Sequence, residues 1–293
     1  MSEQPGSGRF MLSSPQIEVA LAEIRFSPLQ REIAVHEALA FRDALRAVGV
    51  ELEAVQPAAA RELSLTMTPE GVQSSMVAQA NGWQISDAAH QTVVTVLPAA
   101  VSMQTTQYER WSVTMRPALE ALLAAVGEML SPDLRSRVGL RYVNRFAGAA
   151  AGTASYWSTR IDPGLLGALS EASFADRVTG SQQQLDLADG PGRGRTIRHG
   201  CFRDAANRNS FSYLLDIDSF ATTTEPFEAA EIVGVAEELN RVAARTFRGA
   251  LTDAYSAELG LVPAGLAHDS PDATGVQVNG VVRHEHDVAL VSR

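Results

Sequence analysis

The order of hydrophobic patterns along the chain restricts its fold more than any other feature. Apolar residues that alternate with polar ones predict strands, whereas apolar residues that recur every three or four positions predict helices. The chain runs strand, helix, several strands and helix, and it repeats this order from residue 137. This grouping is typical of an α+β protein with an antiparallel sheet.

The first half begins with a predicted strand in "PQIEVALAEIRFSPL", residues 15–29. A helix is expected over 32–48, because its apolar residues have helical spacing and Gly49 can cap its C-terminus. A second helix is expected over 110–130. It contains Pro117, which should kink it or start a new segment, because proline lacks the backbone donor that a helix interior needs.

Several extended runs lie between these two helices. Residues 50–106 contain five of them, with turn signals at Pro57, at 69–71 and at the pair Asn81-Gly82. Asn-Gly between alternating runs is a strong hairpin signal. We therefore expect an antiparallel meander of short strands in this region.

The second half repeats the pattern of the first. Its predicted elements are a strand at 137–146, a helix at 155–170, extended runs at 181–188, 195–204 and 210–218, and a long helix at 225–259. The opening strands also share a texture, "VALAEIRF" against "VGLRYVNRF". An internal duplication would give a curved antiparallel sheet with long helices packed on one face, as in helix-grip or saddle-like folds.

This order divides the chain into four parts. We expect a flexible N-terminal arm at 1–14, a first α+β half at 15–132, a second half at 133–260 that shares one core with the first, and a C-terminal tail at 261–293. The pair Asn279-Gly280 predicts a hairpin in the tail, although two isolated strands are only marginally stable.

Composition narrows the classes of function. The net charge of -10 opposes a general affinity for nucleic acid or anionic lipid, so both partners are disfavoured. All 24 basic residues are arginine, which excludes catalytic lysine chemistry. The single cysteine, Cys201, cannot form an internal disulfide, and the sequence shows neither a long apolar segment nor a signal peptide. We expect a cytoplasmic protein that does not bind membranes.

Four segments carry a resemblance to a known group of proteins. These are "GLRYVNRF" at 139–146, "YLLDIDSF" at 213–220, "PQIEVALAEIRFSPL" at 15–29 and "FRGALTDAYSAELG" at 247–260. Together they resemble a bacterial family of unknown function with a sporadic distribution, over residues 15–260. The resemblance implies a stand-alone protein of similar length and brings no activity with it.

The strand "RVGLRYVNRF" contains the main candidate site. Alternation places Arg137, Arg141 and Arg145 on one face. The other face should belong to the core and includes Val138, Leu140, Tyr142 and Phe146. Asn144 also falls on the core side, where its amide would need partners or would mark a bulge.

Asp216 and Asp218, in "SYLLDIDSF", share one strand face and could lie opposite these arginines. On one interpretation the two strands are neighbours and form a structural ladder of ion pairs. On the other, the arginines line a concave surface and bind an anion or an acidic partner segment, because guanidinium groups match planar oxyanions. Tyr142 completes the set of candidate binding residues.

Other motifs are weaker. Asp216 and Asp218 could bind magnesium, but no third acidic ligand accompanies them at a recognisable spacing. His199 and Cys201 could form a base and nucleophile pair, but no nucleophile-loop signature surrounds them. "GPGRGR" at 190–195 is better explained as a hairpin tip than as a phosphate loop. We therefore expect no metal, no cofactor and no assignable catalytic residue.

The expected function is that of a protein-interaction or regulatory module without catalytic activity. The scattered distribution of the resembling family suggests a mobile or defence-associated locus, with another protein or a second copy as the partner. One alternative is a small-molecule binder or an enzyme that uses a cavity between sheet and helices, with a small anion as its ligand. A further alternative is nucleic-acid binding through the arginines.

Overall fold

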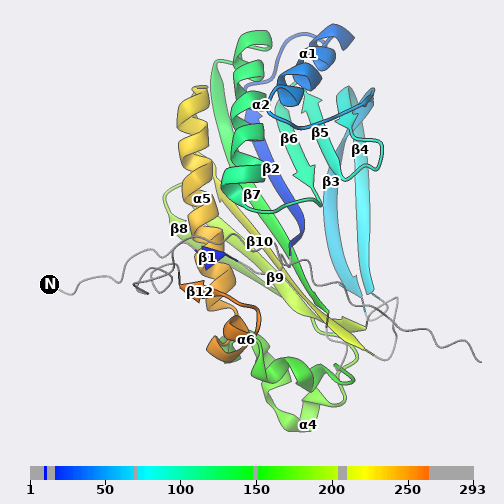
Figure 1. Cartoon of the computed structure of the whole chain (residues 1–293), viewed down its shortest axis with the longest axis vertical. Helices are drawn as coiled ribbons and strands as arrows, with labels where there is room; N and C mark the ends of the chain where they lie inside the picture. Colours follow the sequence, from blue (N-terminus) through cyan, green and yellow to red (C-terminus); the bar gives the residue numbers. More distant parts are fainter. Residues whose placement is uncertain (1–9, 12–16, 69–70, 148–150, 204–209, 264–293) are drawn as a thin grey trace, which may run out of the picture.

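The computed structural model describes residues 10–11, 17–68, 71–147, 151–203 and 210–263. In this part of the chain, helices pack against an open antiparallel sheet of ten strands (Figure 1). The predicted α+β class with an antiparallel sheet is therefore confirmed.

The elements alternate between strand groups and helices. The strands are β1 (Phe10–Met11), β2 (Ile17–Phe26), β3 (Ala54–Thr68), β4 (Gly71–Ser86), β5 (Thr92–Leu97), β6 (Ala100–Thr105), β7 (Leu134–Ala147), β8 (Gln183–Gly190), β9 (Arg193–Arg203), β10 (Phe211–Ala221), β11 (Glu225–Pro226) and β12 (Val262–Pro263). The α-helices are α1 (Val35–Arg46), α2 (Arg116–Met129), α3 (Pro163–Leu166), α4 (Ala172–Ala175), α5 (Ala229–Gly249) and α6 (Asp253–Glu258). A π-helical turn at Trp111–Met115 and two 3₁₀ segments at Ala154–Thr159 and Gly167–Ser170 complete the set.

The two halves of the chain meet at the centre of the sheet. The strand order is β3-β4-β5-β6-β2-β7-β10-β9-β8, and β11 pairs with β7 beside this path. The first strand of each half, β2 or β7, therefore lies in the middle, and the later strands of that half extend outward from it. Strand β4 also comes close to β9 in space. The sheet must therefore curve, because these two strands are far apart in the strand order.

The long helices cover one face of this sheet. Helix α5 lies against β7 and β10 and also packs on α2, which in turn packs on α1 (Figure 1). One continuous hydrophobic core lies between the helices and this face. It includes Ile24 from β2, Leu140 from β7, Leu122 from α2 and Leu239 from α5. We call this side of the sheet the helix-covered face.

The predicted meander is present, but two of its predicted turns are wrong. Pro57 lies within β3, which is an edge strand with a neighbour on one side only. A proline is tolerated in such a strand because the backbone donor that it lacks is not needed on the open side. Asn81 lies within β4, where the pairing register shifts between Ala58 and Ala59. An irregularity of this kind accommodates an extra residue without ending the strand. The five predicted runs therefore fall in three strands, β3, β4 and β5, and the fourth strand of the meander, β6, was not among them.

Helix 110–130 is confirmed with the break that its proline predicts. The π-helical turn ends at Met115, and α2 then begins, with Pro117 in its first turn. A proline is tolerated there because the first backbone donors of a helix have no partner within it. The positive φ of +85° at Gly49 agrees with a glycine that ends α1.

Two other predicted helices are shorter than expected. The predicted helix 155–170 is a series of short segments, because Pro163 begins a new turn and Gly167 takes a positive φ of +52°. The predicted helix 225–259 is wrong as a single element. It divides into α5 and α6 at Thr252, whose hydroxyl accepts a hydrogen bond from the Tyr255 backbone and caps α6.

The ends of the described chain lie side by side. Strand β1 pairs with β12, so Phe10 is opposite Pro263 and Met11 is opposite Val262. The rest of the predicted arm and the predicted hairpin at Asn279-Gly280 lie outside the described residues. In the part of the chain that the structure describes, no helix combines the length and the apolar character needed to cross a bilayer.

Candidate functional site

Strand β7 orients its side chains as the alternation predicts. Val138, Leu140, Tyr142 and Phe146 are buried in the core on the helix-covered face. The amide of Asn144 is buried too, and it donates a hydrogen bond to the Leu215 carbonyl at 3.0 Å. Arg137, Arg141 and Arg145 therefore lie on the opposite face, which we call the ladder face.

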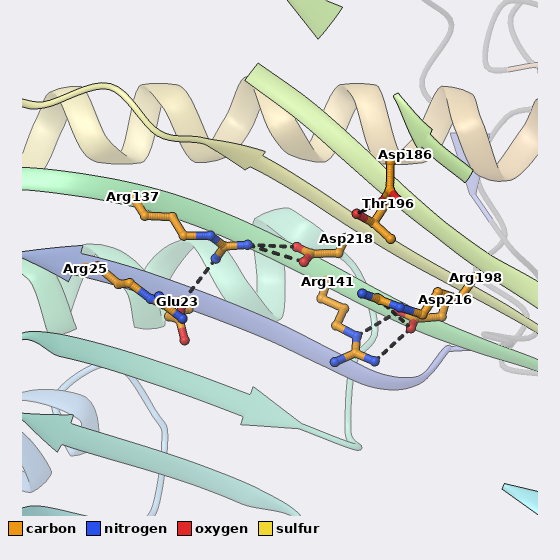
Figure 2. Close-up of polar contacts among 9 residues, drawn as sticks. All are labelled: Glu23, Arg25, Arg137, Arg141, Asp186, Thr196, Arg198, Asp216 and Asp218. Carbon is orange, nitrogen blue, oxygen red and sulfur yellow. Dashed lines mark hydrogen bonds and ion pairs between the residues drawn. The ribbon is translucent and has the colours of Figure 1, made fainter. Parts of the chain in front are cut away.

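Arg137 bonds to carboxylates on both neighbouring strands (Figure 2). Its Nη1 donates to Glu23 Oε1 of β2 at 3.1 Å, and its Nη2 lies 3.3 Å from each carboxylate oxygen of Asp218 in β10. Glu23 also accepts a bond of 2.8 Å from Arg25 Nε. One chain of charges therefore crosses three adjacent strands.

Arg141 and Asp216 form the most buried pair of the ladder face. Arg141 Nε and Nη2 donate to the two oxygens of Asp216 at 2.8 and 2.7 Å, which is the bidentate geometry of strong charge-assisted bonds. The side chain of Asp216 is 1% exposed, and that of Arg141 is 13% exposed. Arg198 of β9 approaches the same carboxylate at 3.4 Å (Figure 2). Asp216 is therefore neutralised from both sides.

Arg145 lies at the end of the stripe. Its Nη1 is 3.6 Å from Glu18 Oε1, and its guanidinium carbon lies 5.7 Å from the centre of the Phe202 ring. Arg137 covers the Phe220 ring in a similar way, at 5.4 Å. Cation–π contacts of this kind let the arginines shield apolar rings on the sheet while their charges remain paired.

The ladder face is balanced in charge. Asp186 of β8 extends the network, because it accepts a bond of 2.7 Å from the Thr196 hydroxyl beside Arg198. Each ionised group of the network lies near an opposite charge. The members are Glu18, Glu23, Arg25, Arg137, Arg141, Arg145, Asp186, Arg198, Asp216 and Asp218. Five positive and five negative groups cancel, so the network has no net charge.

The candidate residues do not all lie together. Five of the six, namely Arg137, Arg141, Arg145, Asp216 and Asp218, lie on the ladder face. Tyr142 lies on the helix-covered face, where its hydroxyl donates to Asn240 Oδ1 of α5 at 2.9 Å. Burial raises the pKa of Tyr142 well above its ordinary value. Tyr142 is therefore a buried packing residue that is separated from the arginines by the sheet.

His199 and Cys201 are buried on the helix-covered face. His199 Nδ1 lies 2.8 Å from the Tyr213 hydroxyl, and Cys201 Sγ lies 3.5 Å from the Ser181 hydroxyl. Burial lowers the pKa of His199 and raises the pKa of Cys201. The neutral thiol is therefore favoured, whereas a nucleophilic cysteine needs the thiolate.

Two cavities of similar size lie elsewhere. One, of about 500 Å³, lies beside the loop that follows α1, and the other, of about 520 Å³, lies beside α5. Neither is lined by any of the six candidate residues. Within the described ranges, no group of three or more histidine, cysteine, aspartate or glutamate side chains is placed to hold a metal ion.

Sequence reasoning missed part of the ladder. Glu23 and Arg25 of β2 alternate in phase with each other, but nothing in the sequence identified β2 as the neighbour of β7. Arg198 was missed for the same reason, because its role depends on β9 lying beside β10.

No protein-family model matches the chain, and no curated protein matches it closely enough to count as a relative. The resemblance of residues 15–260 to a bacterial family therefore stays a prediction.

Proposed function

We propose that the chain is a non-catalytic protein-interaction module and that the ladder face is its interaction surface. The observation that supports this most directly is a set of ten charges, each near an opposite charge, spread over five adjacent strands of one sheet face. A partner protein that presents both signs of charge in a complementary pattern would fit this face. Such patterns determine register and exclude wrong partners.

The exposure of these side chains supports an interface. Arg145, Arg198 and Asp218 are between 22% and 34% exposed, so a partner can reach them without unfolding the sheet. Asp216 and Arg141 beneath them are largely buried and hold the network in place. Partly exposed arginines above aromatic rings are common in interfaces, because they are desolvated at low cost.

The same observations disfavour nucleic-acid binding and catalysis at the ladder face. A nucleic-acid site needs a surplus of positive charge to displace counterions, whereas this network has none. A catalytic carboxylate must reach its substrate, whereas the carboxylate of Asp216 is buried and ion-paired with two arginines. We propose a soluble, cytoplasmic location and either a second protein or a second copy of the chain as the partner.

The experiment compares two charge-reversal variants with equal changes in net charge. Arg25→Glu with Arg145→Glu changes the ladder face. Arg46→Glu with Arg116→Glu changes exposed positions on α1 and α2 and serves as the control. Proteins that the wild type captures from the native host are identified and purified. Their affinity for the wild type and for each variant is measured by calorimetry, and self-association of the three chains is measured by sedimentation.

We expect the ladder variant to bind the partner, or itself, at least tenfold more weakly than the wild type, while the control variant binds normally. Equal binding by both variants, or equal loss in both, would refute the assignment. Binding of DNA or RNA to the wild type with a steep salt dependence would support the nucleic-acid alternative instead.

We also propose that the two halves arose by internal duplication. The support is the strand order, in which β2 is followed outward by β6, β5 and β4, and β7 by β10, β9 and β8. Helices α2 and α5 then occupy equivalent places, because each follows the strand adjacent to the central strand of its half.

A further inference from the structure

A charged cleft lies on the helix-covered face, at the first part of α5. Its volume is about 520 Å³, which is within the range of about 300 to 1,000 Å³ that is typical of small-molecule sites. Strand β11 and the beginnings of β7 and β9 form its other walls. The side chains that matter here are Arg135, Arg193, Arg241, Glu225, Glu231 and Glu237.

Arg135 is the unusual member of this cleft. Strict alternation would place it beside Arg137 on the ladder face. The register between β2 and β7 shifts after the pair Arg25 and Arg137, so that Phe26, a core residue, is opposite Arg135. This irregularity turns the Arg135 side chain toward the helices. A guanidinium group is thereby buried, with an exposed fraction of 3%.

The guanidinium group of Arg135 is incompletely bonded. Its Nη2 pairs with Glu225 of β11, but Nε and Nη1 have no hydrogen-bond partner among the described residues. A buried donor of a charged group that has no acceptor lowers the stability of the fold. Arginine cannot remove this cost by losing its proton at physiological pH. Burial lowers the pKa of Arg135 from its ordinary value, but a guanidinium group stays protonated in a protein. Both donors are covered by the surrounding side chains, so an oxyanion that supplies the missing acceptor must displace part of this cover.

The other charges of the cleft restrict the kind of oxyanion. Arg193 is already paired with Glu238. Glu231 attracts the positive charge of Arg135. Glu237 Oε2 lies 3.8 Å from Arg116 Nη1. The lining has one more glutamate than arginine, so it offers a dianion such as phosphate no surplus of positive charge. The same glutamates would attract an ammonium group.

We infer that this cleft binds a small zwitterion, with its carboxylate on Arg135 and its ammonium group on the glutamates of α5. Free amino acids are the simplest compounds of this class. The inference goes beyond the proposed function, because the cleft lies on the face opposite the ladder and shares no residue with it. Ligand binding here and partner binding there can each fail without the other.

Gly234 gives a way to close the cleft without touching a charge. It lies on α5 in the cleft wall, and a Cβ atom placed there would meet no atom within 4 Å. Gly234→Leu therefore fills the space with a good helix former. Gly127 of α2 is an equally open helical glycine that lies away from the cleft, so Gly127→Leu is the matched control.

The test measures binding of the full chain by calorimetry and thermal shift with each of the common amino acids, and with acetate and inorganic phosphate. We expect at least one amino acid to bind wild type and Gly127→Leu alike, and to bind Gly234→Leu at least tenfold more weakly. Arg135→Gln should also lose binding, and its folding is checked by its unfolding transition.

Three results would overturn the inference. The first is that no amino acid binds the wild-type chain. The second is that Gly234→Leu binds as the wild type does, which would place the ligand elsewhere. The third is that acetate or phosphate binds as tightly as the best amino acid, because the ammonium group would then contribute nothing.

Discussion

Arg141 bonds diagonally to Asp216, although Asp218 is the residue directly opposite it across the two strands. The diagonal contact lets both Nε and Nη2 reach one carboxylate, which matches the planar fork of the guanidinium group. It also leaves Asp218 to Arg137, so each aspartate has its own arginine. The order of the ladder therefore depends on two-point contacts as well as on strand register.

Removing Arg141 should lower the free energy of unfolding more than removing an exposed arginine of the same network. In Arg141→Met, the carboxylate of Asp216 stays buried and keeps Arg198 at 3.4 Å. We expect a loss of about 3 kcal/mol in the free energy of unfolding, as for other broken buried pairs. Urea denaturation measures it. Arg25→Met, whose side chain is 57% exposed, should lose less than about 1 kcal/mol. Similar losses in both variants would mean that the burial of Asp216 contributes little.

Asp218 should reduce stability at neutral pH. Burial, opposed by Arg137 and Arg141, raises its pKa in the folded chain above that in the unfolded chain. The folded state therefore binds the proton more tightly, and stability decreases as pH rises from the unfolded value, about 3.9, through the raised folded value. We expect Asp218→Asn to be more stable than wild type at neutral pH, with no difference once Asp218 is protonated in both states.

Urea denaturation across this pH range tests the sign, and Asp43→Asn on the surface of α1 is the control with the same chemical change. A variant Asp218→Asn that is less stable than wild type at neutral pH would show that the bond to Arg137 outweighs the burial.

Cys201 should resist alkylation in the native chain. Its side chain is fully buried, so an alkylating reagent cannot reach it. Burial also raises the pKa of its thiol, so little of the reactive thiolate is present. We expect modification by iodoacetamide to follow the unfolding transition, with a rate that increases sharply in denaturant. Gly127→Cys places a thiol at an exposed helical position for comparison. Equal rates for the two thiols in the native protein would contradict this prediction.

Gly82 should tolerate no side chain. A Cβ atom there would lie 2.1 Å from the Val96 carbonyl oxygen of the neighbouring strand, so the backbone would have to move. We expect Gly82→Ala to lose at least about 1 to 3 kcal/mol, as other overpacked sites do. Gly127→Ala should instead gain up to about 1 kcal/mol, because alanine favours helix. Thermal unfolding of both variants measures these changes. Unchanged stability in Gly82→Ala would contradict the close approach of Gly82 to the Val96 carbonyl oxygen.

Much of the ladder could be predicted because it depends on local periodicity. The alternation in β7 placed Leu140 toward the core and Arg141 away from it, and the alternation in β10 did the same for Leu215 and Asp216. The identity of their neighbours could not be predicted in this way. Glu23 contacts Arg137 because of strand order, which is decided by packing between distant segments.

The errors have a common physical origin. Pro57 and Asn81-Gly82 resemble turn signals, but an edge position and a register shift accommodate them within long strands. Arg135 was missed because a second irregularity reverses its side. Local propensity does not report whether a strand lies at an edge or where its pairing shifts, so these features require the whole sheet.

The central pairing of β2 with β7 has a consequence for synthesis in the cell. Ala20 lies opposite Tyr142, so on the order of 120 residues separate two strands that must pair. At the usual rates of translation, β2 would leave the ribosome about ten seconds before β7 is complete. During that interval one edge of a central strand has no native neighbour, and such an edge can pair with another nascent chain. We therefore expect newly made chains, rather than finished ones, to be the form of this protein most exposed to aggregation and to capture by chaperones.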